Sequence, residues 1–279
     1  MKNIILVVLY NEIITKTHSF ISLEKSFKKL NRSTDEYEVL FWDNSKADIN
    51  NRHVAEAKSR LAQLGVVTKY INTPENLALS KLYNKVIENY YCEKDYLVVL
   101  DQDSDFDHGY FLAFEKVINL KNPNVILPIV KFKDRIVSPT KVLYLKGFYY
   151  NRPPEGFINS KTVSAINSGM IISLQFIAKH GYRYNEKLRN YCTDDNFMQF
   201  VRKLNGSVYV MDYSFDHDLS LCTLNSNSDS LRTRYNEMVR SKKILYSRNF
   251  LEIAFVNVYF FAHRSYMALK YKDLEYFKG

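Results

Sequence analysis

The segment YLVVLDQDS at residues 96–104 consists of five apolar residues that are followed at once by Asp101, Gln102 and Asp103. A strand is apolar throughout when helices cover both faces of its sheet, so residues 96–100 predict a buried strand of a parallel sheet. Ligands of such sheets bind beyond the carboxyl ends of the strands. We therefore expect Asp101 and Asp103 to lie at the edge of a binding site.

Similar apolar runs recur along the rest of the chain and alternate with helical patterns. Strands are expected over residues 4–9, 38–42, 66–71, 125–130, 170–174 and 207–211. Helices are expected over residues 17–30, 52–64, 74–91, 109–120 and 194–204, and again from residue 230 to the end. This alternation predicts an α/β fold in which a mixed, mostly parallel sheet carries helices on both faces. Residues 131–164 contain Pro, Gly and aromatic residues and are expected to form a loop-rich insertion.

The composition is that of a globular protein with a basic surface. The 279 residues include 39 Lys and Arg against 30 Asp and Glu, for a formal net charge of +9, and 46% are hydrophobic. These values exclude a disordered chain and a long coiled coil. The cysteines Cys92, Cys192 and Cys222 form no CxxC pair, so they predict neither a zinc site nor a disulfide framework and favour a reducing, cytoplasmic location. The most apolar stretch, residues 250–269, is interrupted by charged residues and predicts no membrane span.

Polar residues gather where the predicted strands end. Tyr10 and Asn11 follow the first strand, Asp43 follows the second, and Asp101 and Asp103 follow the fourth. Each cluster taken alone is also compatible with ordinary turn chemistry. An Asp-x-Asp pair provides the hard oxygen ligands that Mg²⁺ and Mn²⁺ prefer, and such ions commonly bind one or two carboxylates together with substrate phosphates. The sequence therefore predicts a metal site and a donor that carries a diphosphate.

Four motifs taken together resemble those of family 2 glycosyltransferases with the GT-A fold. They are VVLYNE at residues 7–12, WDNS at 42–45, ENLA at 75–78 and LDQDS at 100–104. The LDQDS form is similar to that of bacterial rhamnosyltransferases that use a dTDP-sugar. The resemblance covers roughly residues 3–220. It implies a GT-A domain over residues 1–229, with a nucleotide-sugar half up to about residue 130 and an acceptor half after it, followed by a basic, aromatic helical tail over residues 230–279.

The resemblance also implies roles for individual residues. The donor nucleotide would be bound by Tyr10, Asn11, Asp43, Asn76, Lys81, Asp101 and Gln102. Asp43 would receive the nucleobase, and Asn76 and Lys81 would lie near the ribose or the diphosphate, whereas Asp101 would face the nucleoside. From the residues alone, Asn76 is equally compatible with a helix N-terminal cap, and Lys81 with a solvated helix face.

Two later segments would complete the catalytic apparatus. In TDDNF at residues 193–197, the resemblance implies that Asp194 is the general base, with Asp195 as the second candidate; stabilisation of the helix N-terminus by either acid is the other interpretation. In DHDLS at residues 216–220, His217 would bind the metal together with Asp103, although a histidine in an acidic loop is often only a surface residue. Residues 167–170 would form the acceptor floor or merely a tight turn at Gly169.

The tail and the aromatic residues of the insertion leave several partners open. Basic and aromatic helices favour either an anionic membrane surface or packing on the core or on a second subunit, as in a homodimer. The aromatic residues at 144–157 would stack on acceptor sugars or pack against the tail. The acidic strand ends argue against nucleic acid as a partner, because they would repel its phosphates unless a metal intervenes.

Together these observations predict an inverting glycosyltransferase that depends on Mn²⁺ or Mg²⁺. Its donor would be a nucleotide-diphospho-sugar, with dTDP-rhamnose favoured over UDP-hexose and UDP-galactofuranose. Its acceptor would be a cell-surface polysaccharide or a lipid-linked glycan, met in the cytoplasm or at the inner face of the plasma membrane. The alternatives are a non-catalytic module that binds sugar nucleotides or glycans, and a nucleotidyltransferase, which would ordinarily need a Gly-rich basic loop that residues 9–15 do not provide.

Overall fold

The computed structural model describes residues 2–30, 34, 36–47, 49–217 and 228–277. Its main sheet consists of β1 (Asn3–Leu9), β2 (Tyr37–Asp43), β3 (Val67–Asn72), β4 (Tyr96–Asp101), β5 (Val125–Phe132), β6 (Arg135–Ser138), β9 (Gly156–Ile158), β11 (Ile171–Ser173) and β12 (Val208–Asp216). The strand order is β3-β2-β1-β4-β11-β5-β12-β9, and β6 pairs with β5. The pairs among β1 to β4 and the β5–β12 pair are parallel, whereas β6, β9 and β11 are antiparallel to their neighbours. The predicted mixed, mostly parallel α/β sheet is therefore confirmed.

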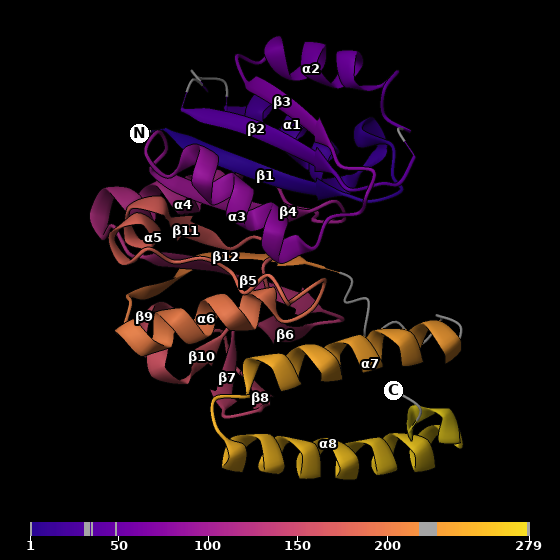
Figure 1. The fold of residues 1–279 in the computed structure, drawn as a ribbon. Helices are drawn as coiled ribbons and strands as arrows, with labels where there is room; N and C mark the ends of the chain where they lie inside the picture. Colours follow the sequence, from indigo (N-terminus) through magenta and orange to yellow (C-terminus); the bar gives the residue numbers. More distant parts are fainter. Residues whose placement is uncertain (1, 31–33, 35, 48, 218–227, 278–279) are drawn as a thin grey trace.

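Helices cover both faces of this sheet (Figure 1). They are α1 (His18–Leu30), α2 (Val54–Ala62), α3 (Leu79–Tyr90), α4 (Gly109–Leu120), α5 (Leu174–His180) and α6 (Thr193–Leu204). Alternate side chains of a strand point to opposite faces of the sheet. Leu6 of β1 therefore packs in a core with residues of α3, α5 and α6. The next residue, Val7, packs in a second core with residues of α1, α2 and α4. Both cores are almost completely buried, which explains why the strands are apolar throughout.

Two predicted bounds were wrong, and one short helix was missed. Helix α3 begins at Leu79 instead of residue 74, because the Asn44 side chain bonds both the N–H and the carbonyl of Leu77 and holds a turn in which Asn76 has φ 51°. The strand expected up to residue 174 ends at Ser173, whose hydroxyl caps the unpredicted helix α5.

The insertion at residues 131–164 is more regular than expected. It contributes β6 and β9 to the main sheet and forms a small second sheet of β7 (Thr140–Leu143), β8 (Lys146–Tyr149) and β10 (Val163–Ser164). The β8 strand is exposed along its whole length. It therefore has no apolar alternation from which a strand can be recognised.

The tail forms two helices that run antiparallel beside the main body (Figure 1). These are α7 (Ser228–Leu245) and α8 (Phe250–Tyr271), followed by a short 3₁₀ turn over Leu274–Phe277. Helix α7 lies between α8 and the rest of the protein. A third core, which includes Leu188 and Cys192 of the main body, binds the two helices to it. No helix within the described ranges combines the length and the apolar character that a bilayer crossing requires.

Candidate active site

Two carboxylates and an imidazole meet at the carboxyl end of the sheet. Asp101 ends β4, Asp103 follows two residues later, and His217 comes directly after β12. The His217 Nε2 atom lies 3.9 Å from Asp101 Oδ2, and its Nδ1 atom lies 3.7 Å from Asp103 Oδ1. One ligand atom from each residue lies within 4.8 Å of the other two. The predicted partners Asp103 and His217 are thus brought together, and Asp101 joins them.

The chemistry of this cluster fits a divalent cation. Although 38% of the Asp101 side chain is exposed, burial by the surrounding protein and the nearby Asp103 carboxylate raise the pKa of Asp101 to about 6. The His217 Nδ1 atom is buried and has no hydrogen-bond partner among the described residues, although buried polar groups are nearly always paired. Two carboxylates and an imidazole are suitable ligands for Mn²⁺ and, less well, for Mg²⁺.

Asp194 and Asp195, in the first turn of α6, lie in different surroundings. Asp195 forms an ion pair with Lys242 and accepts a hydrogen bond from the Ser164 hydroxyl at 2.9 Å. Burial alone would raise the pKa of Asp195, but Lys242, Ser164 and Arg202 outweigh this effect and hold that pKa below its usual value. Asp195 is therefore an ionised, immobilised carboxylate.

Asp194 is the carboxylate of this pair whose pKa is raised. Its Oδ1 atom accepts a hydrogen bond from the Asp195 N–H at 2.8 Å. Burial, then the charge of Asp195, and also that of Asp101, raise the pKa of Asp194 to about 7. Neither acid acts as the N-terminal cap of α6, because the cap position is held by Cys192 at φ 64° without a side-chain cap bond. Asp194 is thus a carboxylate that gains and loses a proton near neutral pH.

The remaining predicted residues form the loops around this cluster. Asp43 is completely buried, and its carboxylate accepts hydrogen bonds from the Ser45 N–H at 2.9 Å, from Asn50 at 2.7 Å and from the Tyr70 hydroxyl at 2.8 Å. Its expected contact with the nucleobase stays a prediction. In the structure, the Asp43 carboxylate at the end of β2 connects the loop after β2 to strand β3, because residues of both donate hydrogen bonds to it.

Gln102 holds the loop after β1. Its side-chain oxygen accepts a hydrogen bond from the Tyr10 N–H at 2.7 Å. The next residue, Asn11, has φ 55° and donates its N–H to the Ser45 hydroxyl at 2.7 Å. Non-glycine residues in this left-handed region are uncommon and often mark functional loops. The Tyr10 side chain is 43% exposed and thus free to meet a ligand.

Asn76 and Lys81 lie at the beginning of the α3 region. Asn76 is not the N-terminal cap, since Ala78 occupies that position. Its side-chain oxygen instead accepts a hydrogen bond from Asn44 at 3.1 Å, and its carbonyl accepts one from Arg189 at 3.2 Å. Lys81 is exposed on α3. Their contacts with ribose or diphosphate stay predictions.

The turn at residues 167–170 is confirmed. Gly169 has φ 77°, and a β-carbon there would lie 2.8 Å from the Phe215 ring. Asn167 donates hydrogen bonds to the Thr193 hydroxyl at 2.9 Å and to the Tyr83 hydroxyl at 3.4 Å, while its own buried side-chain oxygen has no partner among the described residues. The acceptor floor stays a prediction.

Three residues near the acids were not predicted from the sequence, namely Tyr83, Ser164 and Lys242. Tyr83 is buried, and burial followed by the charge of Asp101, with further contributions that include Asp194, raises its pKa well above the usual value. Tyr83 lies on the apolar face of α3, and this position alone does not indicate that it lies near the acids. Lys242 lies on α7, where its sequence neighbours indicate only a solvated basic helix.

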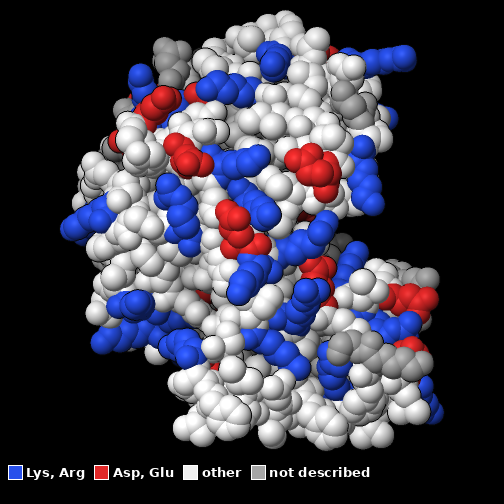
Figure 2. All heavy atoms as spheres, viewed as in Figure 1, with Lys and Arg blue, Asp and Glu red and all other residues white. Residues whose placement is uncertain are grey.

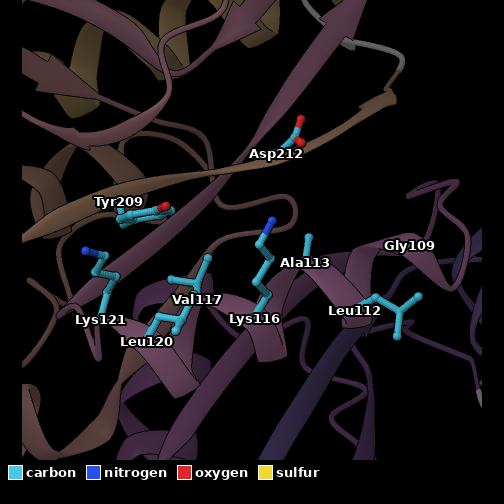
Figure 3. A pocket seen from close by; sticks show the side chains of 9 residues that line it. All are labelled: Gly109, Leu112, Ala113, Lys116, Val117, Leu120, Lys121, Tyr209 and Asp212. Atoms are coloured by element: carbon cyan, nitrogen blue, oxygen red, sulfur yellow. The ribbon is translucent and has the colours of Figure 1, made fainter.

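A separate pocket of about 260 Å³ lies between α4 and β12 (Figure 3). Its lining includes Leu112, Lys116 and Leu120 of α4 and Tyr209 and Asp212 of β12. It contains none of the candidate catalytic or metal-binding residues, so we do not assign it to the active site.

Comparison with known proteins gives matches at the level of structure alone. No family model and no curated protein sequence matches the chain. Residues 1–349 of S. aureus TarS superpose with a TM-score of 0.56 at 16% identity, over 92% of this chain and 68% of that one. GalNAc-T7, solved with UDP, GalNAc and Mn²⁺, superposes with a TM-score of 0.54 at 12% identity, over 79% of this chain and 44% of that one. The chain has the GT-A fold.

This likeness confirms the predicted fold, and the low identities restrict it to the fold. A longer TarS chain, of which this chain covers 41%, gives a TM-score of 0.55. TarS 1–349 was also solved with UDP-GlcNAc. Within the GT-A fold of this chain, the Asp101–Asp103–His217 cluster and Asp194 lie at the carboxyl end of the sheet, where a parallel sheet binds its ligand.

Proposed function

We propose that the protein is an inverting, metal-dependent glycosyltransferase that uses a nucleotide-diphospho-sugar. The observation that supports this most directly is that the turn at residues 167–170 links the Asp101–Asp103–His217 cluster to the acid pair, because Ser168 bonds Ser104, beside Asp103, and Asn167 bonds Thr193, beside Asp194. A base that titrates near neutral pH, placed beside a candidate metal site, is the arrangement that sugar transfer from a diphosphate donor requires.

Asp101, Asp103 and His217 would hold the metal. A bound Mn²⁺ or Mg²⁺ supplies positive charge that stabilises the departing diphosphate. Burial, followed by the charge of the nearby Asp103 carboxylate, raises the pKa of Asp101. The cluster therefore has the electrostatic character of a cation site, and the donor phosphates would complete the set of ligands.

Asp194 would act as the general base. It would accept the proton of the acceptor hydroxyl while that oxygen bonds to the anomeric carbon and the bond to the diphosphate breaks, which inverts the configuration. A base works best when its pKa lies near the working pH, and that of Asp194 is raised to about 7. Asp195 is less suited, because Lys242 and Ser164 occupy its oxygens and keep it ionised. We assign Asp195 to positioning, since its charge raises the pKa of Asp194.

The donor and acceptor are proposed from the motifs and the structural neighbours. The LDQDS segment favours dTDP-rhamnose. UDP-hexose is the alternative that the neighbours favour, since TarS was solved with UDP-GlcNAc and GalNAc-T7 with UDP, and UDP-galactofuranose is a further candidate. The acceptor would be a cell-surface polysaccharide or a lipid-linked glycan. Free thiols at Cys92 and Cys192 are compatible with action in the cytoplasm; Cys222 and residues 218–220 lie outside the described residues.

Calorimetric titration of the full chain with dTDP-rhamnose, UDP-GlcNAc and UDP-galactofuranose, with and without Mn²⁺, tests this proposal. We expect one of them to bind only when Mn²⁺ is present. Asp103→Ala should abolish that binding, whereas Asp105→Ala, an exposed carboxylate two residues away, should preserve it. Absence of metal-dependent binding of any nucleotide sugar would refute the proposal. Binding without donor hydrolysis or transfer to any glycan would instead assign the chain to the non-catalytic binding modules.

A further inference from the structure

The outward face of α8 is long, apolar and free of charge. It is formed by Phe250, Leu251, Ala254, Phe255, Val258, Phe261, Ala262 and Leu269, all of which are exposed. Their spacing of three or four residues places them on one side of the helix. Phe250, Leu251 and Leu269 are each about 80% exposed. Exposed apolar surfaces of this extent mark sites of interaction with a partner or a membrane.

The inward face of α8 is already used. Val256, Phe260 and Ala268 are buried against α7 and the 3₁₀ turn, and the Tyr235 hydroxyl of α7 lies 2.9 Å from His263 Nδ1. A helix with apolar residues on two opposite faces ordinarily buries both of them. Helix α8 lies instead at the edge of the molecule (Figure 1). Its outward face is therefore the part of α8 that lacks a partner.

The apolar surface continues beyond both ends of this helix face. At the N-terminal end, Tyr144 of the β7–β8 hairpin packs on Phe255 with 5.5 Å between ring centres, and Leu143 of the same hairpin is 73% exposed. At the C-terminal end, a hollow of about 430 Å³ is lined by Ser265, Ala268, Leu269, Lys272, Leu274 and Phe277. We call the outward face of α8, Leu143 and this hollow the α8 surface.

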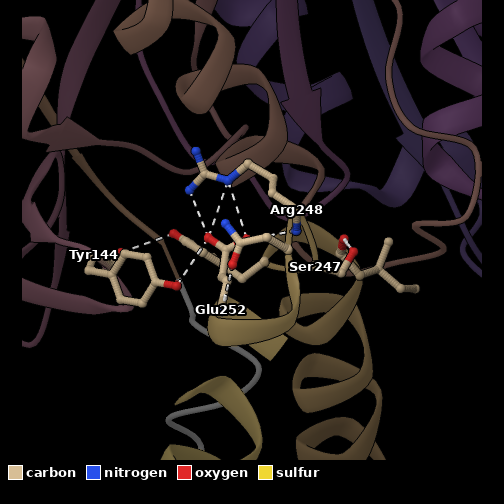
Figure 4. Close-up of polar contacts among 7 residues, drawn as sticks. Tyr144, Ser247, Arg248 and Glu252 are labelled. Carbon is tan, nitrogen blue, oxygen red and sulfur yellow. Dashed lines mark hydrogen bonds and ion pairs between the residues drawn. The ribbon is translucent and has the colours of Figure 1, made fainter. Parts of the chain in front are cut away.

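The carboxylate nearest the beginning of the α8 surface is neutralised. Tyr144 and Arg248 converge on Glu252 (Figure 4). The Glu252 side chain is only 7% exposed and pairs with Arg248 at 2.8 Å. Because this charge is paired and turned inward, it does not interrupt the apolar surface or repel an anionic one.

Five cations border the α8 surface. They are Lys146 on the hairpin, Arg240 and Lys243 on α7, and Lys270 and Lys272 at the end of α8. In the part of the chain that the structure describes, none of these five forms an ion pair. In Figure 2 the lower edge of the molecule, where α8 lies, carries little charge, whereas Lys and Arg gather directly above it. An apolar face bordered by cations is the pattern of a helix that lies in the interface of an anionic bilayer.

This charge distribution disfavours a second copy of the chain as the partner. A twofold contact uses the same patch on both subunits. Lys146 lies at one end of the α8 surface and Lys270 and Lys272 lie at the other. Antiparallel pairing would oppose Lys146 to Lys270 and Lys272, and parallel pairing would oppose each of these cations to its own copy. An anionic lipid surface would attract them in every orientation.

We propose that the α8 surface binds an anionic phospholipid bilayer, with α8 parallel to the membrane plane and its outward side chains among the upper acyl chains. This contact does not depend on the proposed catalytic activity. It adds to that activity a reason for a membrane-borne acceptor. Helix α7, which provides Lys242 to the acid pair, lies directly on α8, so the contact would hold the candidate active site close to the membrane.

Flotation of the full chain with phosphatidylcholine vesicles, with and without phosphatidylglycerol, tests this proposal. We expect binding to the anionic vesicles that weakens as ionic strength rises. Val258→Glu with Phe261→Glu should weaken it by roughly tenfold or more, because the charges would have to enter the acyl region. The matched control is Leu112→Glu with Leu120→Glu, which makes the same change at exposed positions of α4 and should bind as the unchanged chain does.

A second pair of variants tests the electrostatic part. Lys270→Glu with Lys272→Glu should reduce binding to anionic vesicles severalfold while leaving the melting temperature and nucleotide-sugar binding unchanged. The proposal is overturned if the unchanged chain ignores anionic vesicles at low ionic strength, or if the Val258 and Phe261 variant binds them normally. Light scattering without lipid gives a further check: a dimer that this variant dissociates would assign the α8 surface to a second copy instead.

Discussion

Replacing Lys242 by Met should leave the Asp195 carboxylate buried without its countercharge. In the pair, only 15% of the Lys242 side chain and 18% of the Asp195 side chain are exposed. Removing one partner of a buried ion pair costs about 3–5 kcal/mol, and the residual exposure of this pair places the expected loss near the lower value, about 3 kcal/mol. For a chain of this size, such a loss lowers the melting temperature by about 5 °C.

The size of this loss should depend on pH. In the unchanged protein the pKa of Asp195 is held low, so the stabilisation by the pair is complete above the unfolded pKa of about 4 and disappears as the pH falls through the folded value. In the Lys242→Met variant, burial acts without the opposing cation and raises the pKa of Asp195. Below this raised pKa, Asp195 of the folded variant takes up a proton, so the cost of burying its unpaired charge is no longer incurred. The difference in melting temperature should thus be largest near about pH 8 and shrink toward about pH 5.

Differential scanning calorimetry across this pH range measures the effect. Lys243→Met, an exposed neighbour, is the matched control and should change the melting temperature little. Adding Asp195→Asn to Lys242→Met should restore most of the stability, since no unpaired charge remains. Equal melting temperatures for the Lys242 and Lys243 variants, or a loss that does not vary with pH, would refute this account of the pair.

Three further predictions concern the base, the acceptor turn and the tail. Asp194→Asn should retain donor affinity but lower kcat by roughly 10²–10⁴-fold. In a pH–rate profile of the unchanged enzyme, kcat should fall at acidic pH with an apparent pKa at or below about 7. Gly169→Ala should lower the urea midpoint more than Gly156→Ala, because both have positive φ but only Gly169 is crowded. Truncation after Asp229 removes Lys242 and eight of the ten buried residues of the third core, so light scattering should detect aggregation.

Most strands of the main sheet could be predicted from the sequence because each of these is marked by its own run of apolar residues. Both faces of β1 and β4 are buried, and continuous apolar runs mark them. The predicted bounds of α4, residues 109–120, are those observed. Bounds were wrong where a distant side chain decides them, as when Asn44 holds the turn that delays α3. Such a bond joins residues more than thirty positions apart, and no periodicity reveals it.

The candidate site was predictable to the extent that the topology of the fold brings its motifs together. Asp101, Asp103 and His217 meet because β4 and β12 end at the same edge of the sheet. The difference between Asp194 and Asp195 was not predictable. It depends on Lys242, which is 47 positions away from Asp195 on a helix whose packing the sequence does not specify.

The tail illustrates why composition left its role open, since its two helices lie in different surroundings. Helix α7 packs on the main body and provides Lys242, as the packing interpretation expects. Helix α8 is apolar on both sides, but a helix at the edge of a protein can bury only the side that faces inward. The chain itself covers Val256 and Phe260 and leaves Val258 and Phe261 exposed. The exposed apolar side of this edge helix therefore supports the proposed second apolar phase beside it, and the cations that border it without forming ion pairs among the described residues support an anionic surface for that phase.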